Sequence, residues 1–240
     1  MKFVDFQASY GFSPKKALKA DFPYVRSLLE KSGVTVAVLH SLEGLYYDPK
    51  AGNEDVVSVC RENSCKEITF IPSGTFNPLE GVERCLEIVQ RGFDLGIRFW
   101  RLYPEQMRFA ADHPVLNIVL PLIAENGGVV GVDAVPAAVE TIVRIAGDEC
   151  PLVTSLHYYD SANWCLRLSP YANVFPSCRL LHGIESVDYA AKYFPNRIVF
   201  SSDVPFGAIS SPLGLLHPDQ KKRILYENAA PILRRLKYDH

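Results

Sequence analysis

The chain has 240 residues, of which 48% are hydrophobic and 22% charged, with 17 prolines and 15 glycines. This composition excludes a disordered, collagen-like or low-complexity chain. The 25 Lys and Arg residues nearly balance the 27 Asp and Glu residues and are spread along the chain, which argues against a nucleic-acid-binding surface or an anionic-membrane surface.

Short runs of β-branched, apolar and aromatic residues recur along the chain, and a segment with helical character follows each of them. Each run ends in polar residues, glycine or proline, which terminate strands. We therefore predict eight strands: residues 2–8, 34–40, 67–72, 96–102, 129–134, 151–157, 173–180 and 197–203.

The segments between these strands carry signals that begin and end helices. Asn53 is expected to cap a helix, and Asn77 with Pro78 begins another. Gly127 and Gly147 are expected to end helices, because glycine adopts the left-handed C-cap without a steric penalty. The predicted helices are residues 24–31, 54–62, 78–91, 114–126, 136–145, 186–193 and 219–236.

Regular alternation of strands and helices predicts an α/β fold with a parallel sheet, because parallel neighbours need a crossover connection. Eight such units in this length predict a (β/α)8 TIM barrel, with distortion allowed, and residues 1–240 are expected to form a single domain because no linker divides them. The alternative is an open doubly wound sheet. It would normally carry a glycine-rich turn after the first strand, whereas residues 7–11 contain one glycine.

Residues 2–7 hold Asp5 within the first apolar run and no cleavage site follows, so a secretory signal peptide is not expected. Residues 115–124 are the most apolar segment elsewhere, about half of the roughly 20 residues that cross a bilayer. The six cysteines are then expected to be reduced thiols. We expect a soluble, cytoplasmic protein.

In a TIM barrel the reactive groups lie at the carboxyl ends of the strands, where the following loops surround a pocket. The predicted strands place many polar or aromatic side chains at or near these ends. They are Asp5, Gln7, Ser9, His40, Arg98, Arg101, Tyr103, Asp133, His157, Tyr158, Tyr159, Asp160, Arg179, His182 and Asp203.

Two motifs near the end of the chain resemble the amidohydrolase-related family: Ser202-Asp203-x-Pro205 after the last strand, and Asn228-Ala229 in the last helix. Residues 92–98, before and in the fourth strand, and residues 173–175, in the seventh, are similar to that family as well. The resemblance implies a distorted amidohydrolase-superfamily barrel that acts as a hydrolase. It also implies, in many members, a divalent metal held by Asp-x-His-x-His on the first strand, histidines on the fifth and sixth strands, and the last aspartate.

This sequence keeps only part of that ligand set. The first-strand motif aligns with Asp5, Gln7 and Ser9, so both histidines are replaced, and Asp133 stands at the fifth-strand position. Amide and hydroxyl oxygens are poor zinc ligands. We therefore expect no metal cofactor; the alternative is one divalent metal, such as magnesium or manganese, at Asp133, His157 and Asp203.

Some members of the wider superfamily hydrolyse lactones without a metal, and the resemblance therefore implies a hydrolase of a small lactone, ester or amide. Asp203 would be the general base, and His157 would orient the water or polarise the carbonyl. Such a site needs a positive group for the developing oxyanion, and we expect Arg101, nearer the strand end than Arg98, to supply it and to bind a carboxylate on the substrate.

Asp133, Gln7, Ser9, Tyr158 and His40 complete the predicted substrate-binding set. Asp133 could instead cap the helix at residues 136–145. Gln7 and Ser9, with Asp5, could instead form a polar plug across the barrel mouth.

Two other functions stay open. One is a non-catalytic amidohydrolase-like barrel that binds a metabolite or a protein partner, with a pocket that is closed by side chains or that lacks a water position beside Asp203. The other is a mononuclear metal-dependent hydrolase or decarboxylase. The sequence does not identify the substrate, and a homo-oligomer is compatible with it.

Overall fold

The computed structural model describes residues 2–181, 186–207, 209, 214 and 216–238. The predicted site residue Tyr158 has its side chain outside this description, and His182 lies outside the described residues.

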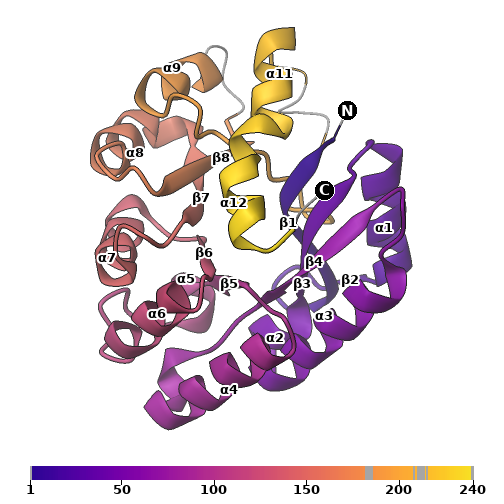
Figure 1. Ribbon diagram of the computed structural model, residues 1–240, viewed down its shortest axis with the longest axis vertical. Helices are drawn as coiled ribbons and strands as arrows, with labels where there is room; N and C mark the ends of the chain where they lie inside the picture. Colours follow the sequence, from indigo (N-terminus) through magenta and orange to yellow (C-terminus); the bar gives the residue numbers. More distant parts are fainter. Residues whose placement is uncertain (1, 182–185, 208, 210–213, 215, 239–240) are drawn as a thin grey trace.

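The core is an eight-stranded, curled sheet in which all neighbouring strands are parallel except the first pair, β2 and β1 (Figure 1). The strand order is β2-β1-β3-β4-β5-β6-β7-β8. The bounds are β1 (Val4–Ser13), β2 (Leu18–Ala20), β3 (Val36–Ser41), β4 (Thr69–Gly74), β5 (Phe99–Leu102), β6 (Val129–Val132), β7 (Leu152–His157) and β8 (Val174–Leu180). The first seven predicted strands correspond to β1 and β3–β8.

The eighth predicted strand is an irregular segment, residues 199–204, that lies between β8 and β1. Val199 bridges Ser177 of β8, and Val204 bridges Ala8 of β1. The Asp203 N–H donates to the Gln7 carbonyl at 2.8 Å. This closing segment completes a distorted α/β barrel; it is not a regular strand because Asp203 has a left-handed φ of 59°.

A bulge in β1 decides which of its side chains face inward. The pairing of β1 with β3 shifts register between Asp5 and Ala8. Phe6 belongs to the apolar cluster inside the barrel, whereas Gln7 and Ser9 line the cavity above it. An extra residue in a strand re-aims the side chains that follow, so two residues adjacent in sequence serve different layers of the interior.

Asp5 ties β1 to the closing segment. Its fully buried carboxylate accepts hydrogen bonds from the Ser202 N–H at 2.9 Å, the Gln7 N–H at 3.0 Å and the Ser202 hydroxyl. Removal from water outweighs these bonds and raises the pKa of Asp5 from 3.8 to about 6.

Helices surround the strands (Figure 1). Their bounds are α1 (Phe22–Lys31), α2 (Leu42–Tyr46), α3 (Pro49–Asn63), α4 (Val82–Asp94), α5 (Pro104–Met107), α6 (Leu116–Glu125), α7 (Pro136–Ala146), α8 (Ser161–Leu168), α9 (Ser186–Tyr193), α11 (Pro218–Leu225) and α12 (Ala230–Arg235), with short 3-10 turns η1 (Pro78–Glu80), η2 (Tyr158–Asp160) and η3 (Glu227–Ala229). Ile232 and Leu233 of α12 pack with Val4 and Val36, so α12 covers the amino ends of these strands. No helix in the described part of the chain is long and apolar enough to span a membrane.

Some local predictions were wrong, and one strand was missed. Asn53 is not a cap: Asp48 caps α3, and the buried Asn53 side chain binds both backbone groups of Thr75. The predicted helix at 219–236 is divided into α11, η3 and α12, because Pro231 cannot donate a helical hydrogen bond. The short strand β2 was not predicted, since Leu-Lys-Ala carries no strand signal.

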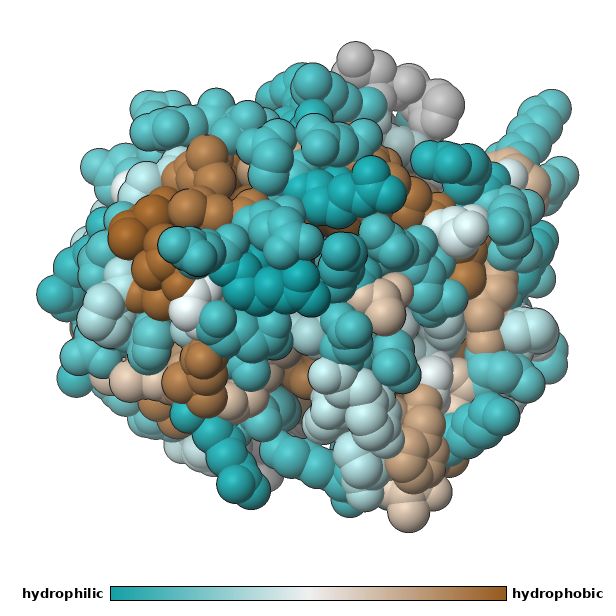
Figure 2. Space-filling model, turned by 90° about the horizontal axis from the view of Figure 1, so that it is seen from below, coloured by the Kyte–Doolittle hydropathy of each residue, from teal (hydrophilic) through white to brown (hydrophobic). Residues whose placement is uncertain are grey.

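Hydrophilic residues cover most of the face shown in Figure 2, and hydrophobic residues form small groups between them. Ile118 of α6 is 48% exposed, whereas Leu116, Val119, Leu120 and Ile123 of the same helix are buried. The strongly apolar sequence of α6 is thus used mainly against the sheet and the neighbouring helices.

The pKa of Asp5 gives a stability prediction. The Asp5 carboxyl holds its proton more tightly in the folded state than in the unfolded state. Asp5 therefore stabilises the fold fully at pH values below 3.8, and this stabilisation is lost as the pH rises through about 6. Between pH 5 and pH 7 the free energy of unfolding of the wild type should fall by about 1 kcal/mol more than that of Asp5→Asn, which has no titrating group. Urea unfolding at the two pH values measures this difference, and equal changes in both proteins would contradict it.

Candidate active site

A cavity of about 550 Å³ opens at the carboxyl ends of the barrel strands. This volume suits a small organic molecule. Five of the predicted site residues line the cavity: Gln7, Ser9, Asp133, His157 and Asp203. The structure thus places these five residues around one cavity, although they come from four different parts of the barrel.

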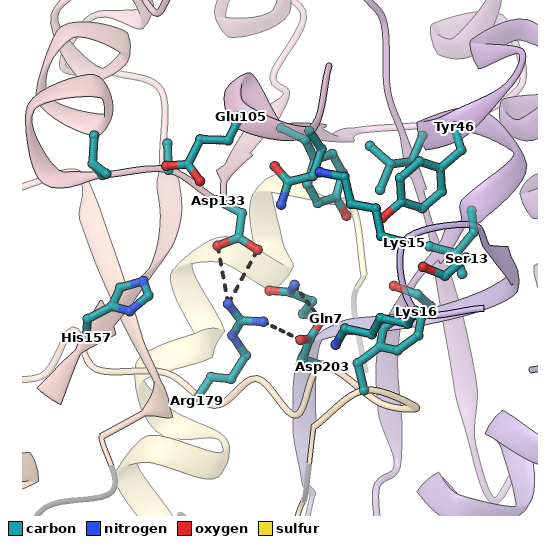
Figure 3. A pocket seen from close by; sticks show the side chains of 18 of the residues that line it. Gln7, Ser13, Lys15, Lys16, Tyr46, Glu105, Asp133, His157, Arg179 and Asp203 are labelled. Carbon is teal, nitrogen blue, oxygen red and sulfur yellow. Dashed lines mark hydrogen bonds and ion pairs between the residues drawn. The ribbon is translucent and has the colours of Figure 1, made fainter. Parts of the chain in front are cut away.

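The centre of the cavity is an arginine between two carboxylates (Figure 3). Arg179 Nη2 lies 3.2 Å from Asp133 Oδ1 and 3.4 Å from Oδ2, and Nη1 forms an ion pair with Asp203 Oδ2. The Arg179 Nε donates to the Ser155 hydroxyl at 3.2 Å. The exposed fractions of the Arg179, Asp133 and Asp203 side chains are 11%, 19% and 20%, so a ligand in the cavity can still reach all three.

Strand alternation explains why Arg179 faces the cavity. Phe175, four residues before Arg179 on β8, belongs to the apolar cluster inside the barrel. Ser177 hydrogen bonds to Ser155 at 3.2 Å, and Arg179 binds the same Ser155. Residues 175, 177 and 179 therefore share one face of β8, and Arg179 is the one nearest the carboxyl end.

A second arginine reaches Asp203 indirectly. Arg101 Nη1 donates to Gln7 Oε1 at 3.0 Å, and Gln7 Nε2 donates to Asp203 Oδ1 at 3.0 Å. Arg101 Nη2 also donates to the Phe6 carbonyl at 2.7 Å. Arg101 faces inward as predicted, but it is buried below the cavity and does not line it.

These contacts set the protonation of the central groups. Burial raises the pKa of Asp203, and Asp133 adds to this, while Arg179, Lys16 and Arg101 act to lower it. Burial acts to lower the pKa of Arg179, but the two carboxylates outweigh it and the pKa is raised. The site thus combines a permanent cation with a carboxylate that holds its proton more readily than an exposed aspartate.

His157 lies at the end of β7 on another wall of the cavity, on the side of Asp133 (Figure 3). Its ring stacks on Trp164 with centroids 5.5 Å apart and lies 5.2 Å from the Tyr159 ring. Half-burial lowers the pKa of His157, although Asp133 opposes the shift. Within the described residues, His157 forms no hydrogen bond with Asp203, so the two predicted catalytic groups approach the cavity from separate walls.

His40 lies beneath the cavity and does not line it. Its ring is buried 5.2 Å from the Tyr103 ring, and Nδ1 lies 3.4 Å from the Ser73 carbonyl. Burial, reinforced by Arg101, lowers the pKa of His40 to about 3, so the ring is neutral. The structure therefore places His40 where it supports Tyr103, a residue that does line the cavity.

Sequence reasoning missed several cavity residues. Arg179 is one of the predicted residues near the strand ends, but the role of stabilising the oxyanion was predicted for Arg101. Arg101 was chosen over Arg98 because it lies nearer the end of its strand, and Arg179 also lies near the end of its strand. Lys15, Lys16 and Glu105 also line the cavity and belong to connections that carry no recognisable motif.

The described residues do not fit a divalent metal ion. None of them form a group of three or more His, Cys, Asp or Glu side chains placed to hold one. Asp133 and Asp203 are instead both paired with the Arg179 guanidinium, which would repel a cation bound to the same oxygens. The alternative set of Asp133, His157 and Asp203 is therefore not assembled as a ligand sphere.

No family model and no curated protein matches the sequence. Solved structures do match. The 5-carboxyvanillate decarboxylase LigW from Sphingomonas paucimobilis has a TM-score of 0.77 at 12% identity, covering 97% of this chain and 99% of that one. A putative amidohydrolase from Staphylococcus aureus has a TM-score of 0.75 at 12% identity, with coverages of 98% and 100%.

The 2,6-dihydroxybenzoate decarboxylase from Rhizobium is also similar, with a TM-score of 0.72, 11% identity and complete coverage of both chains. A 5-carboxyvanillate decarboxylase from Novosphingobium aromaticivorans, 10% identical, was solved in complex with manganese. At these identities the likeness concerns the fold. The predicted resemblance is confirmed at that level: the chain has the fold of the amidohydrolase superfamily.

Proposed function

We propose that this protein hydrolyses a small lactone, ester or amide, and that the Arg179 guanidinium does the electrostatic work that a metal ion does in many proteins of this fold. The observation that carries the proposal is the pairing of Arg179 with both Asp133 and Asp203 on the floor of an open cavity. The non-catalytic hypothesis expected a pocket closed by side chains or one that lacks a water position beside Asp203, and the open cavity argues against the first of these.

Arg179 retains hydrogen-bonding capacity for a substrate. A guanidinium has five N–H groups; among the described residues, Ser155 accepts from Nε, both Asp133 oxygens accept from Nη2, and Asp203 pairs with Nη1. Nη1 keeps one N–H for which the described residues offer no acceptor; it can donate to a carbonyl oxygen, and it would donate more strongly to the oxyanion that forms when that carbonyl is attacked. This role was predicted for Arg101, and we now assign it to Arg179.

Asp203 is the general base in this proposal. Its carboxylate takes a proton from a water molecule as the water oxygen attacks the carbonyl carbon, and the tetrahedral intermediate carries its negative charge beside Arg179. When the intermediate collapses, the bond to the leaving oxygen or nitrogen breaks and the leaving group takes the proton back from Asp203. Gln7, held by Arg101, positions the carboxylate through Asp203 Oδ1.

His157 and Asp133 have supporting roles. The neutral His157 ring can donate or accept a hydrogen bond at the opposite wall, where it can orient the leaving group. Asp133 holds Arg179 from the other side, so that the guanidinium plane is fixed between two strands. Both are therefore expected to affect activity less than Asp203.

A second candidate is a metal-dependent hydrolase or decarboxylase, and one observation favours it. Two structures of a similar decarboxylase contain manganese. Binding of such an ion here would require Arg179 to leave at least one of its carboxylate partners. The two candidates therefore differ in whether Arg179 stays paired with both carboxylates, as in the metal-free hydrolase, or releases at least one of them to a metal ion.

The general base gives the first test. Asp203→Asn keeps the shape and the Gln7 contact but cannot accept the proton, so hydrolysis should fall about 10²- to 10⁴-fold. The assay is release of the carboxylic acid from δ-valerolactone, p-nitrophenyl acetate and acetanilide. Asp148→Asn, an exposed aspartate outside the cavity, is the matched control and should retain full activity. Hydrolysis that survives in Asp203→Asn would refute the assignment.

The pH dependence of kcat/KM gives the second test. Activity requires ionised Asp203, and burial raises its pKa, so activity should fall on acidification at a pH above the usual aspartate range near 4. Arg179→Met removes the charge that lowers this pKa and should move the fall to higher pH, while Arg179→Lys should move it less. Arg144→Met, on the surface, is the control, and thermal unfolding checks that each variant is folded. An unmoved profile in a folded Arg179→Met protein would be incompatible with the proposal.

A further inference from the structure

β1 extends beyond the barrel and forms a hairpin with β2. Gly11, Phe12 and Ser13 pair with Ala20, Lys19 and Leu18 in an antiparallel register. The connection between the two strands is the basic turn, residues 14–17, whose sequence is Pro-Lys-Lys-Ala. The turn ends at Ala17, whose left-handed φ of 46° reverses the chain. The hairpin brings two successive lysines to the cavity.

Both lysines of the basic turn line the cavity, and Figure 3 shows them on the wall opposite His157 and Asp133. Neither makes a salt bridge with any residue that the structure describes. The Lys16 ammonium lies 4.3 Å from the centroid of the Phe206 ring, which also lines the cavity. An aromatic face orients an ammonium group without neutralising its charge.

The other charged side chains of the cavity are either paired with one another or negative. Arg179 is neutralised by its two carboxylates, so Lys15 and Lys16 are the cations of the described lining that lack an acidic partner. Glu105 and Asp160 also line the cavity and carry negative charge; Figure 3 shows Glu105 on the side of Asp133. The cavity is thus positive at the hairpin and negative at the far wall, with Asp203 and Arg179 between the two.

We propose that Lys15 and Lys16 bind a carboxylate of the substrate and thereby place its reacting carbonyl over Arg179 and Asp203. This inference rests on the proposed function, which it deepens by assigning the part of the protein that selects the substrate. An anionic group is drawn to the hairpin and repelled by Glu105 and Asp160, so the substrate enters in one orientation. The lysines are specificity residues and take no part in the proton transfer.

The position of the lysines also affects Asp203. Lys16 acts to lower the pKa of Asp203, which shows that the basic turn and the general base are within electrostatic reach of one another. A substrate carboxylate bound at the turn would partly cancel this effect. Binding of the correct substrate therefore makes Asp203 a stronger base at the moment when it is needed.

Binding of simple probes tests this assignment without requiring turnover. Isothermal titration calorimetry with benzoate and with the neutral benzamide compares the same ring with and without a carboxylate. The wild type should bind benzoate more tightly than benzamide, and added salt should weaken benzoate binding. The double variant Lys15→Gln/Lys16→Gln should lose about tenfold in benzoate affinity with no change for benzamide.

Lys19→Gln is the matched control, because Lys19 lies in the same hairpin but does not line the cavity. It should bind benzoate as the wild type does, and Lys15→Arg/Lys16→Arg should keep most of the affinity. The assignment is overturned if the wild type shows no preference for benzoate, if the glutamine double variant binds like the wild type, or if Lys19→Gln loses affinity equally.

Asp203→Asn separates failure of this inference from failure of the proposed hydrolysis. That variant should still bind benzoate in a lysine-dependent manner while it fails to hydrolyse. Lysine-dependent binding in a protein that hydrolyses none of the esters, lactones or amides would support the basic turn as an anion site and count against the hydrolase alone.

Discussion

The pairing of one guanidinium with two carboxylates is the interaction on which the site depends. Arg179 comes from β8, Asp133 follows β6, and Asp203 belongs to the closing segment. Each carboxylate would be costly to bury alone, and Arg179 would be costly to bury without them. Together they form a fixed group of charges with donor capacity left over, and they hold three separated parts of the barrel in register at its open end.

Barrel closure and the site share the same residues. The closing segment is attached to β1 by Asp5 and Ser202, and one residue later Asp203 turns its side chain into the cavity with a left-handed backbone. The bulge in β1 then lets Gln7 reach Asp203 from the other side of this junction. The irregular geometry that prevents a regular eighth strand therefore directs the Asp203 side chain into the cavity.

Much of this arrangement could be predicted from sequence periodicity. Runs of β-branched and aromatic residues located the parallel strands, and the carboxyl-end rule placed Asp133, His157 and Asp203 around one pocket.

The choice between the two inward-facing arginines could not be made in this way. Arg101 and Arg179 both face inward, but only the stagger of the strands puts Arg101 beneath the cavity and Arg179 within it. The Asp5 contact with Ser202 joins residues 197 positions apart and has no local signal. The basic turn was missed for a related reason, because two lysines in a short connection look like ordinary solvated charge until the hairpin places them over a pocket.

The central claim is that Arg179 stands where a metal would otherwise act, and metal content tests it most directly. Protein purified without added metal or chelator, and a sample incubated with manganese and then dialysed, would be analysed for divalent metals per chain, with hydrolysis measured before and after chelation. The account predicts far less than one metal per chain in both samples and hydrolysis that chelation does not change. A near-stoichiometric metal whose removal abolishes activity would contradict it.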